Sequence, residues 1–441
     1  MWPYHPDLLQ TPVPRYTSFP TAAEFTDAVG AAEMAAALDM VDEPVSLYLH
    51  IPFCEKICWY CGCNTGAANR RERLESYLGA LEQEIAILGA RLRGKAPVTR
   101  IAFGGGSPNA ISPTDFVRLV NGLTIEFGCA SPDWSVEIDP RTLTQAWGDV
   151  LQGVGVRRAS LGVQTFSARI QAAIGREQPD ELIERGVDIL RRAGIASLNF
   201  DLMYGLPGQT MDDLEASLGR SVELGADRIA LFGYAHVPHM IPRQRRIDGS
   251  ALPDQAQRFA MAATGYDLLV GAGYVPIGFD HFARPGDPLA EAARAGRLHR
   301  NFQGFTDDAS RVLIGMGSSA ISSFPDLLAQ NEKNSGRYRM LLSQGMLPAA
   351  LGVPRSARDR ADGAVIEGLL CRGEARLDPA LPRVMERHLA PFVERGLAEM
   401  GTGADRDVLR ILPAGLPYVR TIAALFDPYR THSPRRFSSA I

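Results

Sequence analysis

Residues 45–63 read VSLYLHIPFCEKICWYCGC. The stretch begins with an apolar run at 45–50 that is typical of a buried β-strand. It ends with four thiols that lie within ten residues of one another: Cys54, Cys58, Cys61 and Cys63. In α/β proteins the loops that follow parallel strands carry the functional groups, so this order predicts a site directly after a core strand.

The distribution of the six cysteines argues against a disulfide framework, because Cys129 and Cys371 stand far from the other four and are expected to be small buried side chains. The close spacing of Cys54, Cys58, Cys61 and Cys63 indicates a metal or iron–sulfur site in a reducing compartment. The Cys54-x3-Cys58-x2-Cys61 spacing suits three irons of a 4Fe-4S cluster and leaves the fourth iron open. A zinc knuckle is the alternative, but no further Cys or His pair follows at zinc-finger spacing. Cys63 either completes a four-thiol site or has a catalytic or supporting role.

Five further apolar runs of strand length follow along the chain, at 99–103, 134–138, 158–163, 197–203 and 228–232. Segments of helical period follow the six runs, at 70–92, 112–127, 143–151, 179–193, 211–224 and 254–272. Repeated strand–helix units with right-handed crossovers build a parallel sheet. We therefore expect an α/β fold with a partial (β/α)6 TIM-like barrel.

Glycines and polar side chains stand at the carboxyl end of each run. They are the four cysteines at 54–63, Gly104-Gly105-Gly106, Glu137 with Asp139, Gln164, residues 201–207 and residues 234–236. These loops converge on one face of a parallel barrel, which is where its active site lies. Turn propensity alone explains the glycines and aspartates but not the glutamate and glutamine.

The chain has 441 residues, of which 46% are hydrophobic and 22% charged, which suits one large domain with appendages. We expect an N-terminal arm at 1–40, the barrel at 41–275, a barrel extension and active-site cover at 276–340, and a mainly helical C-terminal domain at 341–441 with a winged-helix shape as one option. Within these parts we expect a strand at 274–282, a loop-bearing insert at 284–306, helices at 363–370 and 382–395, and a hairpin at 401–407.

A net charge of −4 argues against a general nucleic-acid or anionic-membrane binder. The N-terminal residues lack the pattern of a signal peptide, and no run of about 18 uncharged apolar residues occurs. We therefore expect a cytoplasmic protein that binds neither nucleic acid nor membrane. DNA binding through the Arg-rich C-terminal segment is the alternative, and a steep salt dependence would reveal it.

The string at 48–63 resembles the radical S-adenosylmethionine enzymes and, within them, the oxygen-independent coproporphyrinogen III oxidases. The resemblance extends over essentially the whole chain, through RYTSFPT at 15–21, GGGSP at 104–108, EIDP at 137–140, GVQ at 162–164, DLMYGLP at 201–207, DHFARP at 280–285 and HRNFQG at 299–304. The Cys-Gly-Cys ending and the Arg-Tyr-Thr-Ser arm favour the oxidases over haem-chaperone and methyltransferase relatives.

The resemblance implies one 4Fe-4S cluster on Cys54, Cys58 and Cys61, with two S-adenosylmethionine molecules beside it. It implies cofactor contacts from Tyr48, Tyr60, Gly105, Gly106, Ser107, Glu137, Gln164, Arg176, Asp201, Ala235 and Ile321. Tyr60, Gln164, Arg176 and Asp201 are expected to serve the second molecule. Tyr48, His50 and Cys63 are the expected catalytic residues. Ser107 stands where relatives commonly have Thr, and Tyr60 where they commonly have Phe.

The implied reaction is oxidative decarboxylation of two propionate side chains of coproporphyrinogen III, giving the vinyl groups of protoporphyrinogen IX in haem biosynthesis. Arg15, Arg284 and Arg300 are candidates for holding the substrate carboxylates, and His281 and His299 are candidate donors. We expect a monomer that takes electrons from a small electron-transfer protein and passes one to an unidentified acceptor. A radical S-adenosylmethionine methyltransferase and a haem chaperone without turnover are the alternatives.

Overall fold

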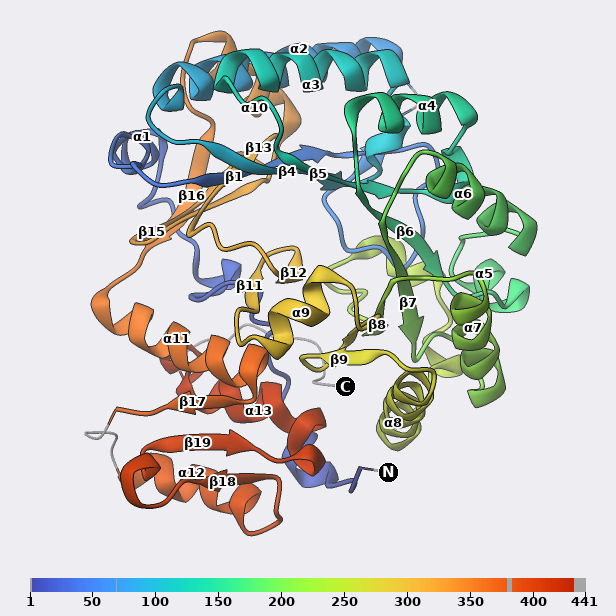
Figure 1. Ribbon diagram of the computed structural model, residues 1–441, viewed down its shortest axis with the longest axis vertical. Coiled ribbons are helices and arrows are strands. Elements are labelled where there is room, and N and C mark those ends of the chain that lie inside the picture. The colour runs from blue at the N-terminus through green and yellow to red at the C-terminus, as the bar shows by residue number, and fades with distance from the viewer. Residues whose placement is uncertain (1, 69, 379–382, 432–441) are drawn as a thin grey trace. The chain divides into compact units, whose positions relative to one another are not determined.

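The computed structural model describes residues 2–68, 70–378 and 383–431 (Figure 1). The chain forms two compact units, each assembled from segments that are distant in sequence. The first unit consists of Phe25–Asp201 and Ser310–Arg355. The second consists of the described residues of 1–24, Leu202–Ala309 and the described residues of 356–441.

The first unit is built on a sheet with a parallel centre. Its parallel strands are β1 (Val45–Ile51), β4 (Val98–Gly105), β5 (Asp133–Ile138), β6 (Arg158–Gln164) and β13 (Val312–Met316). β1 lies between β4 and β13, and β5 and β6 continue the sheet beyond β4. The next strand in the order is β7 (Ser197–Tyr204), in which the boundary between the units falls. The predicted parallel strand–helix repeat is confirmed.

Three antiparallel strands extend this sheet beyond β13: β14 (Ile321–Phe324), β15 (Leu327–Asn331) and β16 (Ala349–Pro354). A separate short pair, β2 (Phe53–Cys54) and β3 (Gly66–Ala67), follows β1. Because β1 is buried along its whole length, its carboxyl end is a fixed starting point for the loop that follows.

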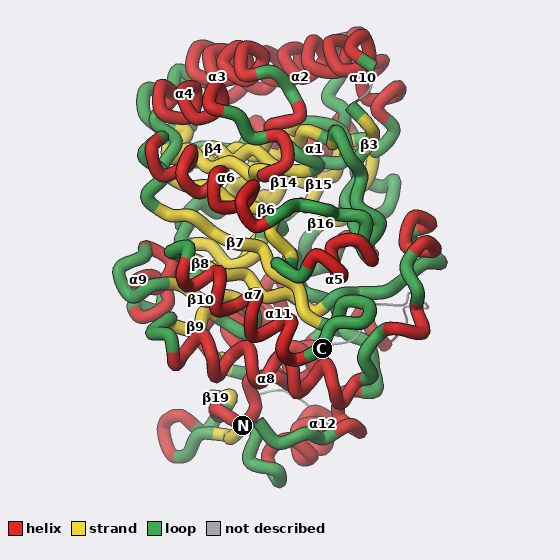
Figure 2. Tube along the Cα trace, turned by 90° about the vertical axis from the view of Figure 1, so that its right-hand side faces the viewer, coloured by secondary structure: helices red, strands yellow, loops and turns green. Residues whose placement is uncertain are grey.

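The helices of the first unit are α1 (Ala31–Asp39), α2 (Arg71–Leu92), α3 (Pro113–Phe127), α4 (Gln145–Val154), α5 (Ala168–Ala173), α6 (Asp180–Arg192) and α10 (Ser335–Ser343). Figures 1 and 2 show α2, α3 and α10 in one layer over the sheet. The limits of α3 follow from sequence: the Ser112 side chain accepts from Asp115 N, Pro113 takes the first turn, and Gly128 ends the helix in a left-handed conformation. Its buried face includes Phe116 and Leu119.

The second unit contains the strands β8 (Arg228–Gly233), β9 (Val275–Ile277) and β10 (His281–Ala283), with β10 antiparallel to both others. Its further elements are α7 (Met211–Glu223), α8 (Gln255–Gly271), α9 (Pro288–Arg294), the hairpin β11 (His299–Asn301) and β12 (Gly304–Thr306), α11 (Ala357–Arg372), α12 (Arg383–Val393), α13 (Val419–Ala423), and a small sheet of β17 (Glu374–Arg376), β18 (Ala398–Met400) and β19 (Val408–Ile411). None of the described helices is both long and apolar enough to cross a membrane.

Some local predictions need correction. The single strand expected at 274–282 is wrong, because β9 and β10 form a hairpin that turns at Gly278 with φ +59°. A Cβ there would come within 2.0 Å of the Phe305 ring, so the turn needs glycine. The insert at 284–306 contains α9 and the β11–β12 hairpin and is not only a loop.

In the C-terminal segment, the helix expected at 363–370 is twice that length, because a capping box at Ser356 starts α11 earlier. The hairpin expected around 401–407 is confirmed by the antiparallel pair β18–β19. The helix expected at 382–395 is observed as α12, and residue 382 lies outside the described residues.

Candidate active site

The three thiols expected to bind the cluster lie on one closed loop, residues 54–66, which we call the cysteine loop. Its two ends are joined because Phe53 pairs with Gly66 and Cys54 with Ala67. The backbone bonds Gly66 N to Pro52 O (2.8 Å) and Ala68 N to Cys54 O (2.9 Å) reinforce this closure. The loop therefore holds its thiols directly after the buried end of β1.

The glycine triplet at the end of β4 packs directly against the start of the cysteine loop. Gly106 N donates to Ile51 O at 2.9 Å, and Ser107 N donates to Phe53 O at 2.8 Å. A Cβ on Gly106 would lie 2.6 Å from Phe53 O, and one on Gly105 would lie 2.6 Å from the His50 ring. The glycines are thus required for contact between the two backbones.

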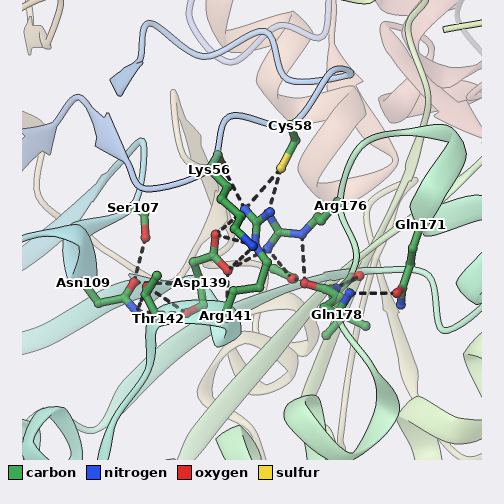
Figure 3. Close-up of polar contacts among 12 residues, drawn as sticks. Lys56, Cys58, Ser107, Asn109, Asp139, Arg141, Thr142, Gln171, Arg176 and Gln178 are labelled. Atoms are coloured by element: carbon green, nitrogen blue, oxygen red, sulfur yellow. Dashed lines mark hydrogen bonds and ion pairs between the residues drawn. The ribbon is translucent and has the colours of Figure 1, made fainter. Parts of the chain in front are cut away.

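Cys58 is the most enclosed of the three thiols, and two arginines donate to its sulfur (Figure 3). Arg141 Nη2 lies 3.3 Å and Arg176 Nη1 lies 3.2 Å from Cys58 Sγ. The Asp139 carboxylate is shared by both guanidiniums, at 2.6 Å from Arg141 Nη2 and 3.5 Å from Arg176 Nη2. Two cations on one sulfur suit an anionic thiolate, which is the form that binds iron.

The charges of this group support one another. Burial alone would raise the pKa of Asp139, but Arg176 and the hydrogen bonds from Arg141 outweigh burial and hold that pKa below its usual range. Asp139 is therefore a carboxylate at neutral pH and balances part of the positive charge.

Arg176 is also fixed by neighbours on β6 and beyond. Its Nη2 donates to Gly162 O at 2.7 Å and its Nε to Gln178 Oε1 at 3.0 Å. Gln178 is itself fixed by two hydrogen bonds. Its backbone N donates to Gln171 Oε1 at 2.9 Å, and its side-chain amide donates to Val163 O. A Cβ on Gly162 would lie 2.8 Å from Arg176 Nη2, so glycine makes room for the guanidinium.

The remaining thiols lie close enough together to affect one another. Burial, followed by the charges of Cys61, Asp139 and Cys58, raises the pKa of Cys54 to about 12, although Arg141 opposes the rise. A cationic iron cluster would relieve this repulsion between thiolates. Among the described residues, no three His, Cys, Asp or Glu side chains converge on a single ion. A 4Fe-4S cluster has a different requirement, since each iron that the protein binds takes a separate thiolate.

Cys63 is arranged differently from the other three. It is exposed, and its backbone N donates to Cys61 Sγ at 3.4 Å. A side-chain hydrogen bond with Cys61, followed by the charge of Cys61, raises the pKa of the Cys63 thiol. Cys63 thus lies beside the Cys61 thiol, and its role stays a prediction.

Tyr48 and His50 lie side by side on β1, two residues apart and therefore on the same face. The Tyr48 hydroxyl is 3.2 Å from His50 Nδ1, and His50 Nε2 is 3.3 Å from Asn64 O on the cysteine loop. Burial lowers the pKa of His50 to about 4, so its imidazole is neutral at pH 7. This pair joins the β1 strand to the loop.

Two carboxylates face the same region from β5 and β7. Glu137 Oε2 accepts from Gly105 N at 3.0 Å, and burial raises its pKa to about 7 despite that hydrogen bond, with Asp201 adding to the rise. Asp201 accepts from Ser160 Oγ and Asn199 Nδ2, both at 2.8 Å. Within the described residues Asn199 Oδ1 is buried and has no hydrogen-bond partner, which leaves an acceptor for a hydroxyl or ammonium group.

Gln164 ends β6 in the left-handed region, with φ +68°, although it is buried and is not glycine. Such conformations cost about 1–3 kcal/mol and are concentrated at functional sites. The conformation supports the prediction that Gln164 contacts a ligand.

The other predicted residues are placed as follows. Tyr60 is half-buried on the cysteine loop, and its electrostatic neighbours are Arg176 and Cys58. The Ser107 hydroxyl donates to Asn109 Oδ1 at 2.7 Å. Ile321 starts β14, where its carbonyl lies against Gly315. Of the predicted cofactor contacts, only Ala235 belongs to the second unit, where its carbonyl accepts from Gln244 Nε2 at 3.0 Å.

The first unit thus contains the predicted cluster ligands, the predicted catalytic residues and the predicted cofactor contacts other than Ala235. It adds four residues that the sequence analysis missed: Arg141, Ser160, Gln178 and Asn199. The sequence did contain a signal for Asn199. Asn199 and Asp201 are two residues apart in β7, so their side chains lie on the same face of the strand. Arg141 follows Asp139 in an Asp-Pro-Arg turn just beyond β5, which is the position where polar groups were already expected.

Comparison with known proteins gives consistent results. The model of the radical SAM superfamily matches residues 48–220. Oxygen-independent coproporphyrinogen III oxidase of Paracoccus denitrificans is 42% identical over 96% of this chain and 95% of its own length, and that of Escherichia coli is 36% identical over 97% and 96%. The solved coproporphyrinogen III oxidase from Escherichia coli, described as a radical SAM enzyme, matches with a TM-score of 0.89 at 35% identity, covering 97% of this chain and 99% of that one. This likeness confirms the predicted α/β, TIM-like architecture.

Proposed function

The chain belongs to the oxygen-independent coproporphyrinogen III oxidases of the radical SAM superfamily, and from this premise we propose how its residues divide the work. The reaction is the oxidative decarboxylation of two propionates of coproporphyrinogen III to vinyl groups, which gives protoporphyrinogen IX in haem biosynthesis. The observation that carries the assignment from geometry is the cysteine loop, in which two arginines donate to the Cys58 thiol and share the Asp139 carboxylate.

The cofactors are a 4Fe-4S cluster and S-adenosylmethionine, and the residues present fit both. Cys54, Cys58 and Cys61 supply three thiolates for four irons, so one iron has no sulfur from this set. When bound, the two cofactors together supply an electron and a 5′-deoxyadenosyl radical that takes a hydrogen atom from the substrate. Arg141 and Arg176 hold Cys58 in place and stabilise its negative charge.

S-adenosylmethionine would be held by groups around the ends of β1, β4, β5, β6, β7 and β14. Glu137, Asp201 and the free acceptor of Asn199 suit the ammonium group and the ribose hydroxyls. The remaining contacts carried over from the family are Tyr48, Gly105, Gly106, Ser107, Ala235 and Ile321. A second S-adenosylmethionine would use Tyr60, Gln164, Arg176 and Asp201.

The predicted catalytic residues act by holding protons and excluding water. His50 is neutral, so Nδ1 and Nε2 can each form one hydrogen bond, and the Tyr48 hydroxyl and Asn64 carbonyl are their partners. This arrangement keeps the Tyr48 hydroxyl fixed in the buried end of β1, where bulk water cannot replace it. Cys63 lies on the cysteine loop beside Cys61 and is the third predicted catalytic residue.

Partners beyond the substrate follow from the chemistry. Reduction of the cluster requires a one-electron donor, for which a small electron-transfer protein is suitable, and the product-forming step releases one electron to an acceptor whose class the chain does not reveal. We infer a cytoplasmic monomer without nucleic-acid or membrane partners.

The test is anaerobic turnover of the reconstituted, reduced protein with coproporphyrinogen III. The expected products are protoporphyrinogen IX and 5′-deoxyadenosine, with the mass falling by CO2 and hydrogen for each vinyl group. A product heavier by one methyl group would indicate the methyltransferase alternative. Tight haem binding without either product would indicate the chaperone alternative. Either result would contradict the assignment.

A further inference from the structure

The second unit contains three guanidiniums gathered at one place, which we call the arginine socket: Arg420, which is buried, and Arg15 and Arg300, which are half-buried. Arg300 and Arg420 both lie over the ring of Phe279, each 5.1 Å from its centroid. Arg15 lies over Phe232 at 5.2 Å. Aromatic faces stabilise a guanidinium but do not neutralise it.

The hydrogen bonds of the socket leave its positive charge unbalanced. Arg15 donates to Gly233 O at 2.9 Å, and Arg300 donates to Tyr16 O at 3.0 Å and to Arg15 O at 2.9 Å, which are all neutral carbonyls. Arg420 is only 8% exposed and forms neither a hydrogen bond nor an ion pair with any described residue. The Nη1 atoms of Arg300 and Arg420 are both buried without an acceptor in the described part of the chain.

The Asp280 carboxylate lies beside Arg15, Arg300 and Arg420. Its closest partner is His281, whose Nδ1 is 2.7 Å from Asp280 Oδ1. No described carboxylate forms an ion pair with any of the three arginines. A second carboxyl, Glu367, accepts from Arg300 N at 3.1 Å, so the three guanidiniums still outnumber the carboxyls near them. Buried charge is rarely left without a partner. Burial, followed by the charge of Arg15, lowers the pKa of Arg420 to about 10.

A small cavity opens onto these groups. Its volume is about 40 Å³, and its lining includes Arg15, Arg420, Asp280, Tyr204 and Phe279. A water molecule needs roughly 10–15 Å³ by this measure, so the cavity has room for about three water-sized groups. That is the size of a carboxylate, and it is far too small for a tetrapyrrole.

We propose that the arginine socket binds one propionate carboxylate of the tetrapyrrole substrate, with Arg420 and Arg15 as its direct partners. Arg300 adds charge behind them and ties the N-terminal arm to the socket through its two carbonyl contacts. This role rests on the proposed function and adds a specificity-determining site to it. A guanidinium with free donors matches a carboxylate in both charge and geometry.

Arg284 provides a matched control from the same unit. It was an equal candidate in the sequence analysis, but its Nη1 donates to Ala272 O at 3.3 Å and its guanidinium lies 4.2 Å from the Tyr274 ring centroid. It does not line the cavity.

The test measures binding of coproporphyrin III, an unreactive tetra-acid, to anaerobic holoprotein by fluorescence titration, with the uncharged tetraamide as the comparison. Arg420→Gln should weaken binding of the tetra-acid by about thirtyfold or more, because a buried charge partner is lost. Arg420→Lys should recover part of the affinity, and Arg284→Gln should leave it unchanged. Binding of the tetraamide should be equally weak in the wild type and in Arg420→Gln.

The inference is overturned if Arg420→Gln binds the tetra-acid as tightly as the wild type while the wild type still converts substrate. It is also overturned if Arg420→Gln lowers the melting temperature and weakens the tetraamide equally, since that pattern identifies a structural role. A wild type that binds coproporphyrin III but never converts coproporphyrinogen III would contradict the proposed function and leave the socket supported.

Discussion

Both units bury arginines, but they balance the positive charge in opposite ways. In the first unit Arg141 and Arg176 share the Asp139 carboxylate and donate to Cys58, so each buried cation faces an anion or a potential anion. In the second unit the arginine socket has neutral carbonyls, aromatic rings and one aspartate that is already bonded to a histidine.

The difference separates two uses of the same side chain. An arginine with all its donors engaged is a positioning residue, because removing it leaves other buried charges unpaired. An arginine whose donors are buried and free carries a cost in the unliganded protein, which a bound anion would repay. Free donors in a buried place therefore identify a ligand site, whereas engaged donors identify the framework of one.

The largest effect is expected from removing the Cys58 sulfur, to which Arg141 and Arg176 donate in the first unit. Cys58→Ala should lose the cluster and all turnover, because the iron set then has two thiolates only. Iron content and the visible absorption spectrum of anaerobic protein measure this. Cys63→Ala should keep the cluster, and Cys129→Ala, a buried cysteine remote in sequence, is the control. Full iron content in Cys58→Ala would refute the ligand assignment and with it the charge balance described for this group.

The second prediction compares one arginine from each group. Arg176→Met should lower the free energy of unfolding by about 3 kcal/mol, because it leaves Asp139 short of a buried partner. Arg420→Met should leave the stability unchanged or raise it, because it removes an unbalanced buried charge. Thermal unfolding of the holoprotein measures both. Equal losses in the two variants would erase the distinction between the groups.

The third prediction concerns Glu84, a buried acid that has hydrogen-bond donors but no cation in its group. It accepts from Gly317 N and Asn331 Nδ2, both at 2.7 Å, and from Tyr338 OH at 2.5 Å. Burial raises its pKa to about 7, although these donors oppose the rise. The folded state holds this proton more tightly than the unfolded state, so stability falls as the pH rises from the ordinary glutamate pKa towards 7.

The loss should reach on the order of 3 kcal/mol above pH 7. Glu84→Gln should remove that part of the pH dependence, so its melting temperature should fall less than that of the wild type between pH 5 and pH 8. Parallel curves for the two proteins would show that burial does not control this carboxyl.

The smallest effect is expected on the surface. Arg71 and Glu75 form an exposed pair at 2.7 Å within α2. Solvent screens such pairs, so Arg71→Ala should leave the melting temperature unchanged within error. A loss as large as that of Arg176→Met would mean that burial is not what separates these arginines.

The sequence predicted the framework well and the contacts poorly. Strand periodicity found β1, β4, β5, β6, β7 and β8, and the cysteine spacing found the cluster residues, because these signals are local. It missed Arg141 as a partner of Cys58, since the two are 83 residues apart and only folding brings them together. It also gave Arg15, Arg284 and Arg300 equal weight, because the engagement of a guanidinium depends on neighbours such as Ala272 and Phe279. Arg420 had no sequence signal at all.

The most direct test of the account is electron paramagnetic resonance of the reduced, anaerobic protein with and without S-adenosylmethionine. Three thiolates on four irons leave one iron able to bind this molecule, so its addition should shift the g values of the cluster signal. A spectrum that stays the same at saturating S-adenosylmethionine, with a full complement of iron, would mean that every iron already has a protein ligand and would contradict the account.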